Sequence, residues 1–454
     1  MLHAGSARRD ITPPVGTPCA LGLDNEALEV LDPIYLRAVA LGDGSTQALI
    51  LAADVIGLYR YADQTVRRRV TRATGVPLEA VILHATHTHQ SPNIRVQNGE
   101  FLRARGLVSY SPEFWTRFQA AAVEAATEAL ADLRPAVLHY GEANVRRIAG
   151  NRRLRQPDGS IVMRGSRDDS EQRRAYPEGY IDPLVRTLRF GREEGDIVLA
   201  NYCCHPTATG GDEGPYITAD FPGYALAEVE AALPGSAGIY LTGPCGNVNP
   251  GKYTGTRSRQ SDAFHMGHSM AQAILCALAD GRPVAGDALR LRSQEVLLPL
   301  RDSLPSEQEL ERLVEEGIAT YSAAKERGES MPGGGPLLNA LCRLHCRRHA
   351  QGDFLPAQVT SLEWGDVLLF ALPGECFLEI DHTIRGHYIN HRVICAENCD
   401  YTASYIPVPE AYLPEAQGYE GRVAHVAPEA FGTLATAACE VWDSPPRRPA
   451  QTAG

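Results

Sequence analysis

The stretch from Ala80 to Pro92 constrains the chain most, because an apolar strand signal runs directly into a cluster of histidines. His84, His87 and His89 fall within it. On an extended chain alternate side chains share a face, so we expect His87 and His89 on one side and His84 on the other. Two imidazoles at a strand end can share one metal ion, or one can bind the metal while the other contacts a substrate, and neutral imidazole nitrogen suits zinc. A strand cap without metal is the alternative, but the His-x-His spacing favours a metal.

Composition excludes several classes of function. Hydrophobic residues at 44% and charged residues at 22% describe an ordinary soluble globular protein. The net charge of −12 disfavours nucleic acid or an anionic membrane as the main partner. No apolar run reaches the ~18 residues of a membrane span, and the N-terminus lacks a signal-peptide core, so we expect a cytoplasmic protein without stable membrane insertion. The scattered cysteines predict free thiols, and a homo-oligomer is compatible with the sequence.

Strand and helix signals alternate along the first part of the chain. Apolar runs at 34–41 and 47–53 flank a turn and predict a hairpin. A helical pattern from Tyr61 ends at Gly75, and Ser111 is a helix N-cap. We predict an α/β fold with a large mixed-sheet domain, flanking helices and a smaller C-terminal α+β lobe. The predicted divisions are 1–285, 286–442 and a disordered tail at 443–454.

Further candidate ligands follow other predicted strands. Asp54 comes after the second strand of the hairpin, His205 after the run that ends at Cys204, and Glu375 after the run that ends at Leu372. Open α/β sheets gather ligands at the carboxyl ends of their strands, so His87, His205 and Glu375 could converge. Three nitrogen or oxygen ligands with an open position are what a catalytic zinc requires.

Eight short stretches match a known family in its order. They are Asp10-Ile-Thr-Pro-Pro14, Ala85-Thr-His-Thr-His-Gln-Ser-Pro92, Asn151-Arg152, Cys204-His-Pro-Thr207, Gly243 to Pro250, Leu372-Pro-Gly-Glu375, Tyr405-Ile-Pro407 and Tyr419-Glu420. In these stretches the chain resembles the neutral (neutral/alkaline), non-lysosomal ceramidases, which are zinc-dependent amidases. The resemblance covers most of the chain and corresponds to their catalytic domain only.

The resemblance implies roles for individual residues. The zinc ligands would be His87, His205, Glu375 and Tyr405. The substrate carbonyl and the developing oxyanion would be held by His89, Arg152 and Tyr419. Zinc can lower the pKa of a bound water to roughly 7, and a histidine such as His89 can carry a proton to the leaving amine.

The chain departs from the family at two points. Asn249 stands where the ceramidases carry a serine, and asparagine can donate a hydrogen bond but cannot act as a nucleophile. The ceramidases also continue into an immunoglobulin-like domain, for which 454 residues leave little room. We therefore expect a soluble or small substrate, with Asn249 placed in the catalytic loop.

The predicted function is zinc-dependent hydrolysis of a carboxamide (N-acyl) bond in a small-molecule or N-acylated substrate. A metallo-β-lactamase-like site would continue as His-x-His-x-Asp-His, but Ser91 and Pro92 occupy those places. An amidohydrolase barrel would need a regular eightfold alternation that the chain lacks. Two alternatives stay open: a zinc-dependent acyltransferase or cyclase, and a non-catalytic zinc-containing binding protein.

Overall fold

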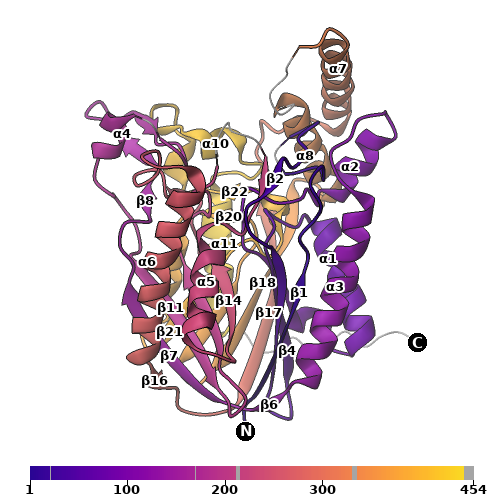
Figure 1. Cartoon of the computed structure of the whole chain (residues 1–454). Coiled ribbons are helices and arrows are strands. Elements are labelled where there is room, and N and C mark those ends of the chain that lie inside the picture. Colours follow the sequence, from indigo (N-terminus) through magenta and orange to yellow (C-terminus); the bar gives the residue numbers. More distant parts are fainter. Residues whose placement is uncertain (21, 169, 211–214, 330–334, 444–454) are drawn as a thin grey trace.

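The computed structural model describes residues 1–20, 22–168, 170–210, 215–329 and 335–443. The predicted tail at 443–454 lies, from residue 444 onward, outside the described residues. Three large sheets, each covered by a pair of helices, make up most of the described chain (Figure 1). The predicted α/β class with mixed sheets and flanking helices is confirmed.

The first sheet has the strand order β5-β4-β3-β1-β6. Its strands are β1 (His3–Asp10), β3 (Tyr35–Gly42), β4 (Gln47–Ala53), β5 (Val81–Ala85) and β6 (Arg134–Pro135). The predicted hairpin is β3 and β4, and β5 then runs parallel to β4. Helices α1 (Arg60–Thr74) and α3 (Pro112–Ala131) cover one face. As the sequence predicted, α1 ends at Gly75 with φ 78°, and Ser111 caps α3 by accepting from the backbone N–H of Phe114.

The second sheet has the order β14-β12-β11-β7-β16. Its strands are β7 (Val137–Asn144), β11 (Leu184–Gly191), β12 (Ile197–Tyr202), β14 (Ala237–Thr242) and β16 (Arg282–Pro283). Here too one pair, β12 and β14, is parallel. Helices α5 (Asp220–Ala232) and α6 (Arg259–Ala279) pack on its outer face.

The third sheet has the order β17-β18-β19-β21, and its β19 and β21 are parallel. The strands are β17 (Leu289–Pro299), β18 (Phe354–Trp364), β19 (Val367–Ala371) and β21 (Arg392–Ala396). Helices α9 (Glu379–His387) and α11 (Glu429–Glu440) cover it. Each large sheet therefore has one pair of parallel strands, and in each sheet this pair includes the strand at one edge.

The inner faces of the three sheets share one core. Along β19, Leu368 and Phe370 pack under the helices, whereas Val367, Leu369 and Ala371 enter a cluster that contains strands of all three sheets. Strands buried on both faces need apolar residues at every position, which explains their unbroken apolar runs. Because this cluster contains residues from both sides of position 285, the N- and C-terminal parts are packed together, and their division into domains stays a prediction.

The sequence of the segment from 149 to 183 has little hydrophobic periodicity and contains no clear strand or helix pattern. The structure instead contains β8 (Gly150–Asn151), β9 (Arg153–Arg155), β10 (Ile161–Met163) and α4 (Glu171–Ala175). These elements are too short to leave a periodic signal in the sequence. The remaining short strands are β2 (Glu29–Val30), β13 (Tyr216–Ile217), β15 (Val248–Asn249), β20 (Glu375–Cys376) and β22 (Tyr405–Ile406).

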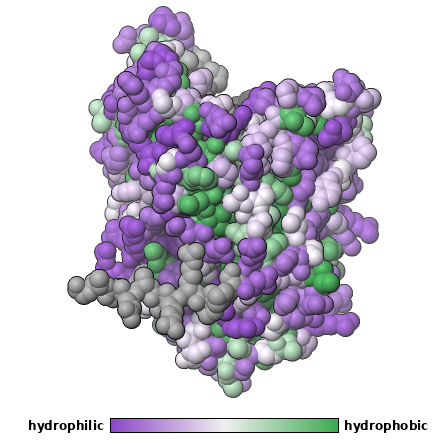
Figure 2. All heavy atoms as spheres, turned by 180° about the vertical axis from the view of Figure 1, so that it is seen from behind, coloured by the Kyte–Doolittle hydropathy of each residue, from purple (hydrophilic) through white to green (hydrophobic). Residues whose placement is uncertain are grey.

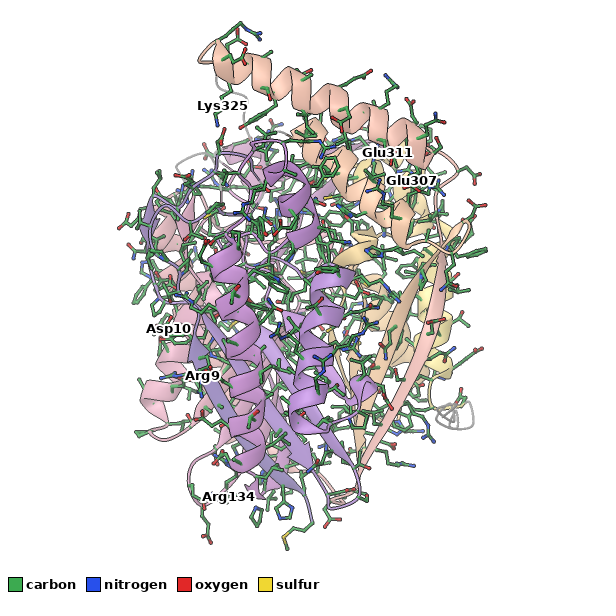
Figure 3. The ribbon with its side chains drawn as sticks, turned by 90° about the vertical axis from the view of Figure 1, so that its right-hand side faces the viewer. Arg9, Asp10, Arg134, Glu307, Glu311 and Lys325 are labelled. Carbon is green, nitrogen blue, oxygen red and sulfur yellow. The ribbon has the colours of Figure 1, made fainter. Side chains whose placement is uncertain are left out.

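A separate helical layer lies at one end of the molecule. It contains α2 (Val96–Arg103), α7 (Glu307–Glu326) and α8 (Gly335–His349), with the short helix α10 (Tyr419–Val423) nearby in Figure 1. In Figure 3, α7 runs along the top with Glu307 and Glu311 at one end and Lys325 at the other. Both glutamates pair with Arg348 of α8, but exposed pairs of this kind add little stability.

The surface is mostly polar. Figure 2 shows hydrophilic residues over most of the face opposite to that of Figure 1, with hydrophobic residues gathered near its middle. Among the described residues, no helix combines the length and apolar character needed to cross a membrane. The cysteines are free, and most are buried, as the sequence predicted.

Candidate metal centre

In each large sheet, the loops that follow the two parallel strands lie side by side at the candidate site. In every pair, the loop after one strand carries a candidate ligand and the loop after its neighbour supplies a group that holds the ligand. His87 follows β5, His205 follows β12 and Glu375 follows β19. The site therefore lies at the carboxyl ends of parallel strands, where α/β sheets commonly bind ligands.

His87 is fixed by the loop after β4. Its side chain is fully buried, and its Nδ1 lies 2.5 Å from the carbonyl oxygen of Ile56. Its φ of 70° shows that the chain is no longer extended here, so the alternation expected for the histidines applies only as far as the end of β5. His84, still within β5, does face away: its ring bonds the carbonyl of Glu397 and the N–H of Thr242. His84 thus links loops of all three sheets.

Asp54 supports the same corner of the site. Its carboxylate accepts hydrogen bonds from the guanidinium of Arg37 and the backbone N–H of Tyr35, at 2.9 and 2.8 Å. It also accepts one from the hydroxyl of Thr86, next to His87. Asp54 therefore orients the histidine loop without reaching the cluster itself.

His205 is fixed by the loop after β14. Its Nδ1 lies 2.8 Å from the carbonyl oxygen of Cys245 and 3.0 Å from that of Val248. These acceptors place the proton on Nδ1 and leave Nε2 as the free lone pair. Burial lowers the pKa of His205 to about 4, which keeps the ring neutral.

Glu375 brings the two histidines together. Its Oε2 lies 3.0 Å from Nε2 of His205 and 3.3 Å from Nε2 of His87. Burial alone would raise the pKa of Glu375, but the two adjacent imidazoles hold it well below its usual value. Tyr401, which follows β21, donates its hydroxyl to the other carboxylate oxygen. The predicted approach of His87, His205 and Glu375 is what the structure shows.

A glycine allows this close approach. A Cβ added to Gly246 would lie 2.9 Å from the backbone carbonyl oxygens of both Glu375 and Cys376, a contact that carbon atoms do not make. The backbone N–H of Gly246 donates to the carbonyl of Cys376 at 2.7 Å. This backbone amide of the loop after β14 therefore holds β20 in place.

The donor set fits a metal ion. The Nε2 atoms of His87 and His89 are buried and have no hydrogen-bond partner among the described residues. Donor atoms of His87, His89 and His205 all lie within 4.8 Å of one another. We call these three residues the histidine cluster. Unpartnered buried nitrogens beside a carboxylate are costly unless a cation or a donor occupies the space between them, and imidazole with carboxylate is a donor set that zinc accepts.

His89 differs from the other two histidines. It is partly exposed, whereas His87 and His205 are fully buried. It also has no backbone carbonyl bonded to its ring among the described contacts, and such a bond is what usually orients a metal-bound imidazole. Burial, reinforced by the neighbouring imidazoles, lowers the pKa of His89 well below its ordinary value.

Tyr405 and Arg152 form the wall beside Glu375. Tyr405 is the register partner of Glu375 in the two-stranded sheet of β20 and β22, so the two side chains share a face. The guanidinium of Arg152 lies 5.3 Å from the ring centroid of Tyr405 and donates to Glu420 at 2.7 Å and to the carbonyl of Gly246 at 2.5 Å. Arg152 is therefore buried, neutralised and rigid.

Tyr419 stands at the outer edge of this wall. Its ring lies 5.7 Å from that of Tyr405 and 5.9 Å from the guanidinium carbon of Arg152. Tyr419 is 46% exposed, whereas Tyr405 is 5% exposed, so Tyr419 lies at the side from which solvent reaches the site.

Asn249 is occupied elsewhere. Its amide donates to the carbonyl of Arg164, and its oxygen accepts from the N–H of Gly251, both at 3.1 Å. These contacts tie Asn249 to the surrounding loops, and none of its described contacts reaches the histidine cluster. A catalytic part for Asn249 stays a prediction that these contacts do not support.

Sequence reasoning missed Tyr401 and Glu420 as functional neighbours. Glu420 belongs to the matching stretch Tyr419-Glu420, whereas Tyr401 lies four residues before the stretch that begins at Tyr405. The sequence signal for each was weak. Tyr401 is a second tyrosine in the loop that follows a buried strand, and Glu420 is an acid next to Tyr419, an aromatic residue of the candidate site. Neither reveals its partner, because Glu420 is 268 residues from Arg152 along the chain.

Comparison with known proteins identifies the fold. No protein-family model matches the chain, and no curated protein matches its sequence. Neutral ceramidase from Pseudomonas aeruginosa superposes with a TM-score of 0.71 at 18% identity, over 97% of this chain and 74% of that one. A ceramidase complexed with C2 gives a TM-score of 0.72 at 18% identity, over 99% and 76%. The chain has the fold of these ceramidases, which confirms the fold that the resemblance implied.

Proposed function

We propose that the protein is a zinc-dependent hydrolase that cleaves a carboxamide bond of a small or N-acylated substrate. The observation that carries the proposal is the convergence of His87, His205 and Glu375 from three sheets, beside Nε2 atoms of His87 and His89 that are buried and lack hydrogen-bond partners among the described residues. The same fold in two ceramidases supports an amide as the bond that is cleaved.

The zinc ligands in this proposal are His87, His205, Glu375 and Tyr405. For the histidines, the carbonyl bonds at Nδ1 support this choice, because they aim Nε2 at the centre. For Tyr405, the register pairing with Glu375 supports it. When bound there, zinc would supply a nucleophile near neutral pH by lowering the pKa of water to roughly 7, and it would polarise the amide carbonyl.

Arg152 and Tyr419 suit the stabilisation of an oxyanion. Arg152 is buried and held by Glu420, so it needs little reorganisation when negative charge develops on the carbonyl oxygen. Tyr419, at the open side, can donate its phenol hydrogen to the same oxygen. Such fixed donors are worth about 3–4 kcal/mol each in barrier height.

His89 suits proton transfer to the leaving amine. Its lowered pKa keeps the ring neutral, so a ring nitrogen retains a lone pair that can receive a proton, and its partial exposure places it toward the substrate side of the cluster. A ring locked as a metal ligand could not exchange protons in this way.

The test combines metal analysis of the purified protein with a chelator-sensitive hydrolysis screen over N-acyl amines and short peptides. We expect stoichiometric zinc and amide hydrolysis that stops on chelation and returns with added zinc. Protein that holds zinc but turns over no amide would favour the acyltransferase or binding alternatives. Protein that binds no zinc would overturn the proposal.

A further inference from the structure

Arg95 is a buried cation that has no anionic partner among the residues that the structure describes. It precedes α2, its backbone N–H donates to Asn93, and the residue is only 9% exposed. Its Nε is buried without a hydrogen-bond partner, and none of the described ion pairs or side-chain hydrogen bonds involves its guanidinium. An uncompensated buried charge costs stability, so folding alone gives no reason for an arginine at this position.

The other buried arginines of the described chain all have acceptors. Arg37 pairs with Asp54, Arg67 with Asp63, Arg152 with Glu420, Arg186 with Asp182, and Arg164 and Arg259 donate to backbone carbonyls. Arg95 is therefore the exception, and the contrast with Arg152 is the most informative, since both lie near the candidate centre.

A chain of aromatic contacts leads from Arg95 to the centre. Its guanidinium lies 5.3 Å from the ring centroid of Tyr59, and that ring packs edge-on against Tyr401 at 5.1 Å. Tyr401 in turn donates to Glu375. Burial raises the pKa of Tyr401 and of Tyr419, and the charge of Arg95 offsets part of that rise for both. The charge of Arg95 therefore reaches both Tyr401, which contacts Glu375, and Tyr419, which lies at the open edge of the site.

A small cavity borders Arg95. Its volume is about 10 Å³, and its lining includes Tyr59, Asn98, His345 and His349. This is room for about one water molecule. The cavity is too small for a carboxylate, so an anion that pairs with Arg95 has to approach the guanidinium from another direction.

We propose that Arg95 binds a carboxylate carried by the substrate, so that the enzyme selects anionic amides such as N-acyl amino acids or monoamides of dicarboxylic acids. This rests on the proposed amide hydrolysis. A guanidinium offers a planar pair of donors that matches one carboxylate. A doubly charged phosphate would need a second free cation, but Arg152 and Arg153 already share Glu420.

The test uses substrates that differ in charge alone. With the zinc-loaded protein, hydrolysis of N-hexanoylglycine is compared with that of N-hexanoylpropylamine and of the cationic N-hexanoyl-ethylenediamine. The same comparison at the acyl end uses N-propylsuccinamate against N-propylbutyramide. In one of the two series we expect kcat/KM to favour the carboxylate by about 100-fold over the neutral amide, because a buried, hydrogen-bonded charge pair is being formed.

The variants separate binding from structure. Arg95→Gln should lower kcat/KM far more for the carboxylate substrate than for its neutral counterpart and so remove most of the preference, and Arg95→Lys should restore part of it. Arg103→Gln, on the exposed side of the same helix, is the matched control and should change neither rate. Arg95→Gln should also keep or raise the thermal midpoint, whereas a structural role would lower it.

Calorimetric binding of N-hexanoylglycine and N-propylsuccinamate to the chelator-treated protein is measured separately from turnover. Equal rates for charged and neutral amides, or a preference that survives Arg95→Gln, would overturn the role of Arg95 and leave the hydrolase intact. If no amide is hydrolysed at all, the proposed function fails, and calorimetry alone tests the anion site. Carboxylate binding that Arg95→Gln abolishes supports the anion site. Absence of carboxylate binding to the unmodified protein refutes it.

Discussion

The described residues include two groups of potential metal ligands, and these groups differ in how their charge is compensated. The histidine cluster has imidazole nitrogens without partners beside the carboxylate of Glu375. The second group is Asp182, Asp381 and His382, whose donor atoms lie equally close together. Proximity alone would rank both as metal sites.

Arginines compensate the carboxylate charges of the second group, although Oδ2 of Asp381 has no hydrogen-bond partner among the described residues. Asp182 lies 2.7 Å from Arg186 and 2.9 Å from Arg385, and Arg385 also lies 2.6 Å from Asp381. His382 shares a hydrogen bond with the hydroxyl of Tyr180. Two carboxylates facing two guanidiniums leave no net charge to attract a cation, so this group holds the fold together. The comparison teaches that clustered donors indicate a metal site only where no arginine compensates their charge.

The largest expected effect is loss of the histidine cluster. His87→Ala should remove both bound zinc and hydrolysis, because it deletes one ligand and leaves Glu375 with one imidazole. Metal analysis and amide turnover check this. His382→Ala, in the second group, should retain both; a loss of zinc in that variant would break the comparison.

Arg152→Ala should keep zinc and lower kcat/KM by about 10²–10³-fold, because an oxyanion donor is removed while the ligands remain. Zinc content and steady-state kinetics are measured on the same preparation. Arg155→Ala, exposed on β9, is the control and should match the unmodified protein. Zinc loss in Arg152→Ala would show that Arg152 organises the ligands instead.

Asp381→Asn should leave zinc content unchanged and lower the free energy of unfolding by about 3 kcal/mol, because it breaks a buried ion pair from one side. Urea unfolding measures this. Glu316→Gln removes one partner of an exposed pair with Arg312 and should cost under about 1 kcal/mol. If Asp381→Asn were as stable as the parent, the carboxylates would not be part of the scaffold.

The smallest effect is expected for Tyr401→Phe, which removes the hydroxyl that donates to Glu375. Zinc affinity should fall by roughly 10-fold, as for other groups that orient a metal ligand. Competition with a chromophoric chelator measures it. Tyr412→Phe deletes a hydroxyl bonded to the carbonyl of Val426, away from the site, and should leave affinity unchanged.

Local patterns determined much of the fold in advance. The hairpin of β3 and β4, the end of α1 at Gly75 and the cap of α3 at Ser111 each depend on residues close together in the chain, and each was predicted. The positions of His87, His205 and Glu375 after apolar strands were likewise visible, because strand ends can be recognised from the sequence. The weakly patterned segment at 149–183 was not resolved into elements.

What the sequence by itself determined is the set of elements and the candidate ligands at their ends, because period and turn chemistry act over a few residues. Only the tertiary structure decided which side chains find partners. Tyr401 donates to Glu375. Arg152 pairs with Glu420 and Arg95 pairs with no acid in the described chain, although nothing in the local sequences of these two arginines distinguishes them. Partners are set by how the loops of three sheets face one another across the shared core, and that packing has no local signature.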